Sequence, residues 1–174
     1  ISTAIEYNRY VTIKKLHNFF DHKYRIIWSK TELIKNIEKI QHPVIRETIK
    51  LLKIKDGLEI IHYADLPARS GLGSSSSFTV AMVMVLYVYK NSYRSKKNLA
   101  NMAIKLEREI LREKVGIQDQ IAASFGGLNY TEINKNGSYK VKEIKMSSED
   151  QLSFENNFLL FYTGIQRFAS NIAK

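Results

Sequence analysis

Hydrophobic and polar positions along the chain follow two periods, one typical of strands and one typical of helices. β-Branched and aromatic residues alternate with polar ones over 1–13 and 24–29, and a further apolar run covers 58–63, so strands are predicted there. After Pro43, which suits the first turn of a helix, apolar residues recur at helical spacing up to Leu52. The order of these elements predicts a mixed α+β fold rather than a strict βαβ alternation.

Other segments also show helical patterns. Thr31 can cap a short helix whose apolar positions are Leu33, Ile34, Ile37 and Ile40. The run 78–89 is apolar on all sides, which predicts a helix buried at the centre of the fold. Ser95 can cap a helix with one apolar face (Leu99, Met102, Ala103, Leu106 and Ile110), and Gly116 breaks that pattern.

In the last third of the chain, the pattern predicts several short helices and strands in succession. Residues 118–125 predict a short helix that Gly126-Gly127 ends. Segments 128–133 and 139–146 predict a hairpin, because the turn sequence Asn134-Lys-Asn-Gly137 separates them. A final strand is expected over 157–163 and the beginning of a helix over 165–174.

The most distinctive segment joins the apolar strand 58–63 to the apolar helix 78–89, and it reads Asp65-Leu-Pro-Ala-Arg-Ser-Gly-Leu-Gly-Ser-Ser-Ser-Ser-Phe78. Glycines 71 and 73 permit backbone conformations that a side chain disfavours. The serines stand where a helix begins, and a helix N-terminus with free N–H groups attracts phosphate. Glycine and serine also compose flexible linkers, but a linker does not normally separate a buried strand from an apolar helix. The segment therefore predicts a phosphate-binding loop.

Two common phosphate motifs are excluded by their spacing. No Gly-Lys-Ser/Thr follows the second glycine, as a P-loop requires. A dinucleotide fingerprint needs a third glycine three residues after Gly73, and position 76 is a serine.

Composition limits the class of protein and its partners. The chain of 174 residues carries a net charge of +10, but its basic residues are scattered, which is typical of a solvated surface. No apolar run reaches the ~20 residues that cross a membrane, so no membrane partner is expected. The chain has no cysteine, which excludes disulfides and thiolate metal sites but does not decide the compartment. No export leader is visible, so a cytoplasmic location is expected. The chain starts at Ile1 without methionine, and we expect the true N-terminus to precede it. The four histidines share no ligand spacing, and no zinc site is expected.

The stretch Pro67-Ala-Arg-Ser-Gly-Leu-Gly-Ser-Ser-Ser76 resembles the nucleotide-binding motif of the galacto-, homoserine, mevalonate and phosphomevalonate (GHMP) kinases, with Ser76 where alanine is usual. Val115-Gly-Ile-Gln-Asp-Gln120 and Phe125-Gly-Gly-Leu-Asn129 are similar to the sugar-kinase branch. Together these motifs most resemble the D-glycero-D-manno-heptose 7-phosphate kinases. The resemblance implies the α+β fold of the GHMP kinase N-terminal domain, a mixed sheet packed with helices that is similar to a ribosomal-protein fold. Residues 1–174 would be most of that domain, with its start and the C-terminal domain absent.

For the nucleotide site, the resemblance implies ATP and Mg²⁺ as cofactors. The residues implied in ATP binding are Pro67, Arg69, Ser70, Gly71, Leu72, Gly73, Ser74, Ser75 and Ser76. It places one magnesium ligand on Ser75 and a second on a glutamate. The helical pattern alone leaves Glu107 and Glu109 as alternatives, since they flank the apolar face from opposite sides. The family's spacing to the catalytic aspartate favours Glu109.

For catalysis, the resemblance implies Asp119 as the residue that accepts the proton of the substrate hydroxyl, or only orients it. From the sequence alone, Asp119 is also an ordinary acidic residue in the first turn of a helix. Gln118 and Gln120 could hydrogen-bond sugar hydroxyls. Arg167 could reach the substrate phosphate, although a plain surface arginine explains that position equally well.

These inferences predict an ATP-dependent sugar kinase that acts on a sugar phosphate. The expected reaction transfers the γ-phosphoryl group to C1 of D-glycero-D-manno-heptose 7-phosphate, for nucleotide-heptose and surface polysaccharide synthesis. One alternative is a fucose- or galactose-type sugar kinase. Another is a non-catalytic domain that binds nucleotide or RNA, although no stripe of basic and aromatic residues predicts a nucleic-acid partner. Since part of the family's site would lie beyond the chain, activity of the fragment alone is not predicted.

Overall fold

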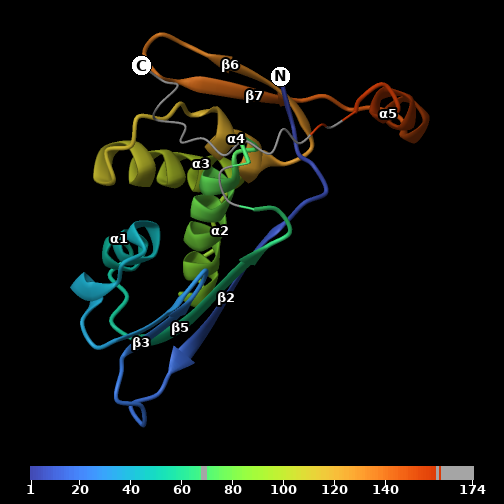
Figure 1. The fold of residues 1–174 in the computed structure, drawn as a ribbon. Coiled ribbons are helices and arrows are strands. Elements are labelled where there is room, and N and C mark those ends of the chain that lie inside the picture. Colours follow the sequence, from blue (N-terminus) through green and yellow to red (C-terminus); the bar gives the residue numbers. More distant parts are fainter. Residues whose placement is uncertain (68–69, 160, 162–174) are drawn as a thin grey trace.

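The computed structural model describes residues 1–67, 70–159 and 161 of the chain. Its larger sheet has the strand order β2 (Arg9–Leu16), β5 (Gly57–Ala64), β3 (Tyr24–Ile27) and β4 (Thr31–Ile34). Strand β5 is antiparallel to β2 and parallel to β3, so the sheet is mixed (Figure 1). The predicted α+β class is confirmed, and the strands expected over 24–29 and 58–63 are present.

A smaller sheet consists of β1 (Ser2–Thr3), β6 (Leu128–Ile133) and β7 (Tyr139–Glu143). Strands β6 and β7 form the predicted hairpin, and β1 pairs antiparallel with the start of β6. The expected single strand over 1–13 is therefore two strands in different sheets. The residues between β1 and β2 cross from one sheet to the other, and this crossing forms a wall of the site described below.

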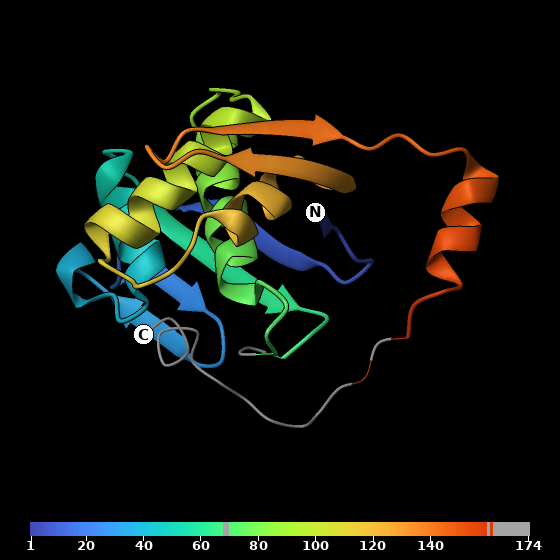
Figure 2. The same cartoon turned by 90° about the horizontal axis from the view of Figure 1, so that it is seen from above.

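Helices α2 (Ser74–Tyr89), α3 (Lys96–Ile104) and α4 (Gln118–Phe125) lie between the two sheets (Figure 1). Helices α1 (Pro43–Leu51) and α2 cover one face of the larger sheet, as Figures 1 and 2 show. Helix α3 continues into the π-helical turn η2 (Lys105–Ile110), and α4 follows. Helix α2 contacts α1, α3, α4 and β2, which confirms its predicted central position.

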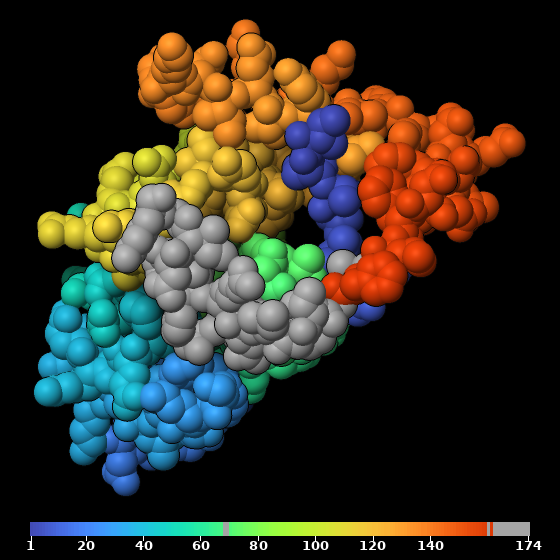
Figure 3. Space-filling view, turned by 45° about the horizontal axis from the view of Figure 1, so that its top comes forward, coloured from blue at the N-terminus to red at the C-terminus, as the bar shows by residue number. Residues whose placement is uncertain are grey.

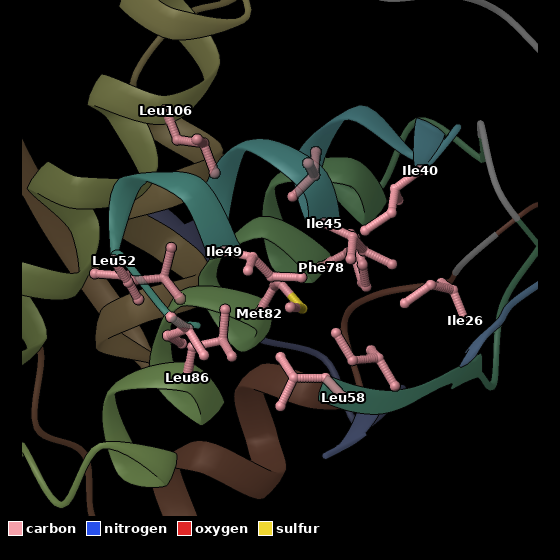
Figure 4. Close-up of a cluster of buried hydrophobic side chains, with 14 of the residues drawn as sticks. Ile26, Ile40, Ile45, Ile49, Leu52, Leu58, Phe78, Met82, Leu86 and Leu106 are labelled. Atoms are coloured by element: carbon pink, nitrogen blue, oxygen red, sulfur yellow. The ribbon is translucent and has the colours of Figure 1, made fainter. Parts of the chain in front are cut away.

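The main core lies where α1 and α2 meet the larger sheet. Ile49 of α1, Met82 and Leu86 of α2, and Leu58 of β5 are fully buried and point toward one another (Figure 4). Burial of one such side chain is worth roughly 1.5–3 kcal/mol. The core thus fixes β5 and α2, and these are the two elements that the glycine-serine loop connects.

Two expected elements differ in the structure. The segment 31–34 is the strand β4 and not a helix, because it pairs with β3 and buries Glu32. The Glu32 carboxylate accepts hydrogen bonds from Trp28 Nε1 at 2.8 Å and from the Gln41 amide at 2.7 Å. Only a short 3₁₀ turn, η1 (Ile37–Lys39), follows this strand. These partners are close in sequence, but the apolar spacing that suggested a helix does not reveal the pairing with β3.

After β7 the structure also differs from what the sequence pattern predicted. It forms a helix, α5 (Ser148–Glu155), which Ser147 caps by accepting a hydrogen bond from the Asp150 amide at 3.0 Å. Residues 157–159 and 161 are not in a strand, whereas the rest of the expected strand 157–163 lies outside the described residues. The helix expected over 165–174 also lies outside them. Within the described part of the chain, no helix has the length and apolar character needed to cross a membrane.

Two histidines are packed around Phe78 at the edge of the core. The ring centroid of His42 lies 4.9 Å from that of Phe78, and the centroid of His62 lies 4.3 Å from it. Burial lowers the pKa of His42 to about 4, against a weaker opposing effect of the nearby Glu32 charge. Burial, with smaller contributions from Arg9 and His42, lowers the pKa of His62 to about 4 as well. Both rings are therefore neutral at pH 7.

We expect these histidines to make the fold sensitive to acid. In the unfolded chain a histidine binds its proton near pH 6.5, but the folded chain binds it only near pH 4, so the free energy of unfolding falls as the pH drops between these values. For His42 the full effect is about 3 kcal/mol. The variant His42→Phe should lose less stability than the parent between pH 7 and pH 5, as measured by urea unfolding. His17→Phe, the same change at an exposed position, is the control, and equal pH dependence of the parent and His42→Phe would contradict the prediction.

Candidate functional site

The glycine-serine loop ends directly at the first residue of α2. Gly73 precedes Ser74 with φ +66°, and Gly71 has φ +79°, both in the left-handed region that favours glycine. Among the described residues no side chain caps the N-terminus of α2, so its first N–H groups can bind an anion. The predicted helix start at the serines is confirmed. Phosphate binding at this terminus stays a prediction.

The carboxylate of Asp119 lies beside this loop. The position that a Cβ atom would take on Gly73 is 3.3 Å from Asp119 Cγ and 3.5 Å from Asp119 Oδ2. Helix α4 packs against α2 and carries Asp119 exposed in its first turn. Forty-six residues separate the two positions in the sequence, so it is the packing of α4 on α2 that brings an acidic group to the predicted phosphate site.

Gly73 and Asp119 open into one cavity of about 500 Å³. Its wall on the loop side is formed by residues 71–74, and α2 adds Ser77 and Met84. Helix α4 contributes Asp119 and Ser124, and the N-terminal crossing between the sheets contributes residues 2–5 and 7–9. In Figure 3 the hollow lies beside the dark blue N-terminal residues and the bright green start of α2. A cavity of this size suits a small phosphorylated metabolite.

A buried polar network lies under the start of α2. Glu107, on η2, is only 1% exposed, and its Oε2 accepts a hydrogen bond from Ser76 Oγ at 2.9 Å. The same oxygen accepts a hydrogen bond from Gln120 Nε2. Its other oxygen, Oε1, is buried and has no hydrogen-bond partner among the described residues. Burial and the charge of Glu107 also raise the pKa of Glu113. A buried carboxylate with a free oxygen can accept a cation.

The structure brings Glu107, and not Glu109, to the loop. Glu109 is exposed. Residues two apart on a helix point in nearly opposite directions, so only one of these glutamates can face α2. The serine that reaches the carboxylate is Ser76, while Ser75 lies exposed at the same helix start. Sequence spacing to Asp119 favoured Glu109, but in the π-helical turn η2 the buried glutamate that contacts the start of α2 is Glu107, so we transfer the metal-ligand hypothesis to Glu107.

The two glutamines flanking Asp119 have different environments. Gln120 is 1% exposed and donates to Glu107, so it positions that carboxylate and does not line the cavity as a sugar ligand would. Gln118 is exposed, and its side chain folds back over Gly116. Neither placement supports the expected contact with sugar hydroxyls. Arg69 and Arg167 lie outside the described residues.

The remaining loop residues differ in exposure. Pro67 is exposed, Leu72 is 39% exposed, and Ser70 is partly buried with an Oγ atom that has no partner among the described residues. The sequence pattern did not indicate the wall formed by residues 2–9. The alternating pattern of polar and apolar residues does not reveal that β2 begins beside a cavity.

Comparison with known proteins identifies the family. The model of the GHMP kinases N terminal domain matches residues 32–127, which is more than half of the chain. The chain belongs to the GHMP kinase family. The matched range includes both the glycine-serine loop and Asp119.

Individual relatives of this GHMP kinase domain are sugar kinases. It is 34% identical over 110 residues to a D-glycero-alpha-D-manno-heptose 7-phosphate kinase from Campylobacter jejuni, covering 63% of this chain and 32% of that protein. It is 31% identical over 105 residues to a galactokinase from Thermococcus kodakarensis, covering 59% of this chain and 28% of that protein. The crystal structure of a D-glycero-D-manno-heptose 1-phosphate kinase from Bacteriodes thetaiotaomicron superposes with a TM-score of 0.71 at 26% identity, covering 80% of this chain and 48% of that one. The chain thus spans between 28% and 48% of the length of these relatives.

Proposed function

We propose that this domain binds ATP and carries the catalytic aspartate of a sugar kinase. The observation that carries the proposal is the approach of the Asp119 carboxylate to Gly73 within one cavity. Phosphoryl transfer needs a phosphate cradle and a group that orients the attacking hydroxyl. Residues 70–76 supply the cradle in this proposal, Pro67 and Arg69 belong to the same sequence motif, and Asp119 supplies the second group.

In the proposed reaction, the oxygen of a sugar hydroxyl attacks the γ-phosphorus of ATP. The bond between that phosphorus and the β,γ-bridging oxygen breaks, and ADP leaves with the electron pair. The hydroxyl proton passes to the Asp119 carboxylate, either before transfer or as the new bond forms, and then to solvent. The free N–H groups at the start of α2 hold the phosphates in place during these steps.

Magnesium completes the proposed site. Mg²⁺ prefers oxygen ligands, commonly one or two from the protein with the rest from phosphate and water. Glu107 Oε1, which is buried without a partner among the described residues, fits this requirement together with the exposed hydroxyl of Ser75. When bound, the ion would neutralise charge on the transferred phosphoryl group. Gln120 and Ser76, which both bond Glu107 Oε2, would hold the carboxylate in its orientation.

The proposed acceptor is a heptose phosphate, with C1 of D-glycero-D-manno-heptose 7-phosphate as the first choice. The motifs of the loop and of the Asp119 region, and the 34% identity to a heptose 7-phosphate kinase, support this choice. The product would feed nucleotide-heptose and surface polysaccharide synthesis in the cytoplasm. The similarity to a galactokinase makes an unphosphorylated hexose the second candidate acceptor.

A panel of acceptors tests the proposal. ADP release by the full-length protein should be measured with heptose 7-phosphate, heptose 1-phosphate, galactose and fucose, and the products identified by mass spectrometry. We expect turnover with a heptose phosphate and a bisphosphate product. Turnover only with galactose or fucose would assign the second acceptor class. Binding of RNA in a salt-dependent manner without any binding of ATP would overturn the kinase proposal.

The proposed magnesium site can be tested with two glutamate variants, one at the proposed ligand and one at an exposed position nearby. Glu107→Gln should lower activity by at least about 10-fold, with a larger loss at low magnesium, because it removes a ligand charge. Glu109→Gln makes the same change two residues away on an exposed position and should leave activity near the parent value. The effects of Glu107→Gln and Ser75→Ala should be non-additive if one ion links them. A silent Glu107→Gln with a damaging Glu109→Gln would restore the original assignment.

A further inference from the structure

A half-buried arginine without an acidic partner lies at the edge of the cavity. Three arginines among the described residues are partly buried: Arg9, Arg25 and Arg46. Arg25 pairs with Glu59, and Arg46 pairs with Glu47. Arg9 has no such carboxylate within the described part of the chain. Because a partly desolvated guanidinium is unfavourable without an anion, this difference requires an explanation.

Among the described residues, the one polar contact of the Arg9 side chain is with a neutral ring. Arg9 Nη1 lies 3.1 Å from His62 Nε2 on the adjacent strand β5. Burial lowers the pKa of His62 to about 4, so at pH 7 its ring can accept this hydrogen bond but carries no charge. The His62 ring is itself held against Phe78. The contact therefore orients the guanidinium without neutralising it.

The other terminal nitrogen of Arg9 remains unsatisfied. Nη2 is shielded from solvent and has no hydrogen-bond partner among the described residues. Arg9 nevertheless lines the same cavity as Gly73 and Asp119. It is the first residue of β2 and pairs with Ala64, the last residue of β5, where the chain turns into the loop. This end of the strand pair is held by Asp65, whose Oδ2 accepts a hydrogen bond from the Asn8 amide at 2.7 Å.

We propose that Arg9 binds the phosphate group that the sugar acceptor already carries. This inference rests on the proposed function and deepens it, because it makes a phosphorylated sugar the preferred acceptor. The shared chemistry is a phosphate oxygen facing a guanidinium fork, and ATP is the other possible source of that phosphate. The acceptor is favoured because the start of α2 already provides a cradle for the nucleotide, whereas Arg9 comes from β2 in the larger sheet.

Binding measurements on phosphorylated and unphosphorylated sugars test the inference. Calorimetry on the full-length protein should use D-glycero-D-manno-heptose 7-phosphate and the same heptose without phosphate as probes. We expect Arg9→Leu to weaken binding of the phosphorylated heptose by about 10- to 100-fold and to leave the unphosphorylated heptose and ATP nearly unchanged. Arg9→Lys, which keeps the charge and loses the fork, should fall between Arg9→Leu and the parent. The control is Arg25→Leu, which removes a partly buried arginine that faces Glu59 and does not line the cavity.

Each possible outcome decides the inference. An equal loss for both heptoses, or no loss for either, overturns it. Weaker ATP binding with unchanged heptose binding would assign Arg9 to the nucleotide phosphate and also overturns it. If the parent protein shows no preference for the phosphorylated heptose, the inference is wrong as well. A protein that phosphorylates none of the acceptors, but binds heptose 7-phosphate through Arg9, would refute the proposed function and leave this inference standing.

Discussion

Replacing Asp119 with asparagine is expected to slow phosphoryl transfer by about 10²–10⁴-fold while leaving ATP affinity nearly unchanged. Asparagine keeps the size of the side chain and removes the charge that accepts or orients the hydroxyl proton. The loop and the start of α2, rather than Asp119, hold the phosphates in the proposed site. Single-turnover transfer and equilibrium nucleotide binding should be measured on the same preparation of the full-length protein.

A competing explanation of Asp119 is structural and can be separated from the catalytic one. As a first-turn residue of α4, Asp119 also complements the helix dipole, which is worth about 0.3–1 kcal/mol. Asp150→Asn makes the same change in the first turn of α5, away from the cavity, and should affect stability alone. Near-normal turnover of Asp119→Asn would mean that the carboxylate only stabilises the helix.

The sequence predicted those elements whose signals are local. Residues 118–125 were expected as a helix and form α4, and the four serines were expected at a helix start and begin α2. In both cases glycines mark the boundary, since Gly73 and Gly126 have positive φ angles next to the helix ends. The segment 31–34 was predicted as a helix but forms the strand β4. It is stabilised by pairing with β3 and by the hydrogen bonds of the buried Glu32, and apolar spacing reports neither of these.

In the candidate site too, some features could be predicted from short motifs, whereas others depend on the packing of segments that are distant in sequence. The loop and Asp119 could be recognised from short motifs. Their approach to one another could not, because it depends on how α4 packs against α2. The choice between Glu107 and Glu109 required the π-helical turn η2, which shifts the residue that faces the loop. Arg9 could not be recognised from the sequence, because an arginine at the start of a strand is ordinary unless the structure shows that the strand begins at a cavity.

The second large effect is expected from substitution of Gly73. A side chain there would strain the backbone and would also press against Asp119, the proposed catalytic residue. A non-glycine residue at φ +66° costs roughly 1–2 kcal/mol. The Cβ atom would stand 3.3 Å from Asp119 Cγ, closer than most Cβ contacts, so Asp119 must move. In valine two further methyl groups enter the space that the phosphates require. Displacement of about 1 Å at a reacting centre can lower rates by about 10²-fold.

We therefore expect Gly73→Val to abolish detectable ATP binding in the full-length protein and to lower turnover by about 10²-fold or more. Gly137→Val is the matched control, because Gly137 also has a positive φ, +82°, but its Cβ position has no neighbour within 4 Å among the described residues. That variant should be destabilised by a similar backbone strain and still bind ATP. Nucleotide titration and urea unfolding on both variants separate the two effects. Parent-like ATP affinity in Gly73→Val would show that phosphates do not approach the backbone at this glycine, and the loop would lose its proposed role.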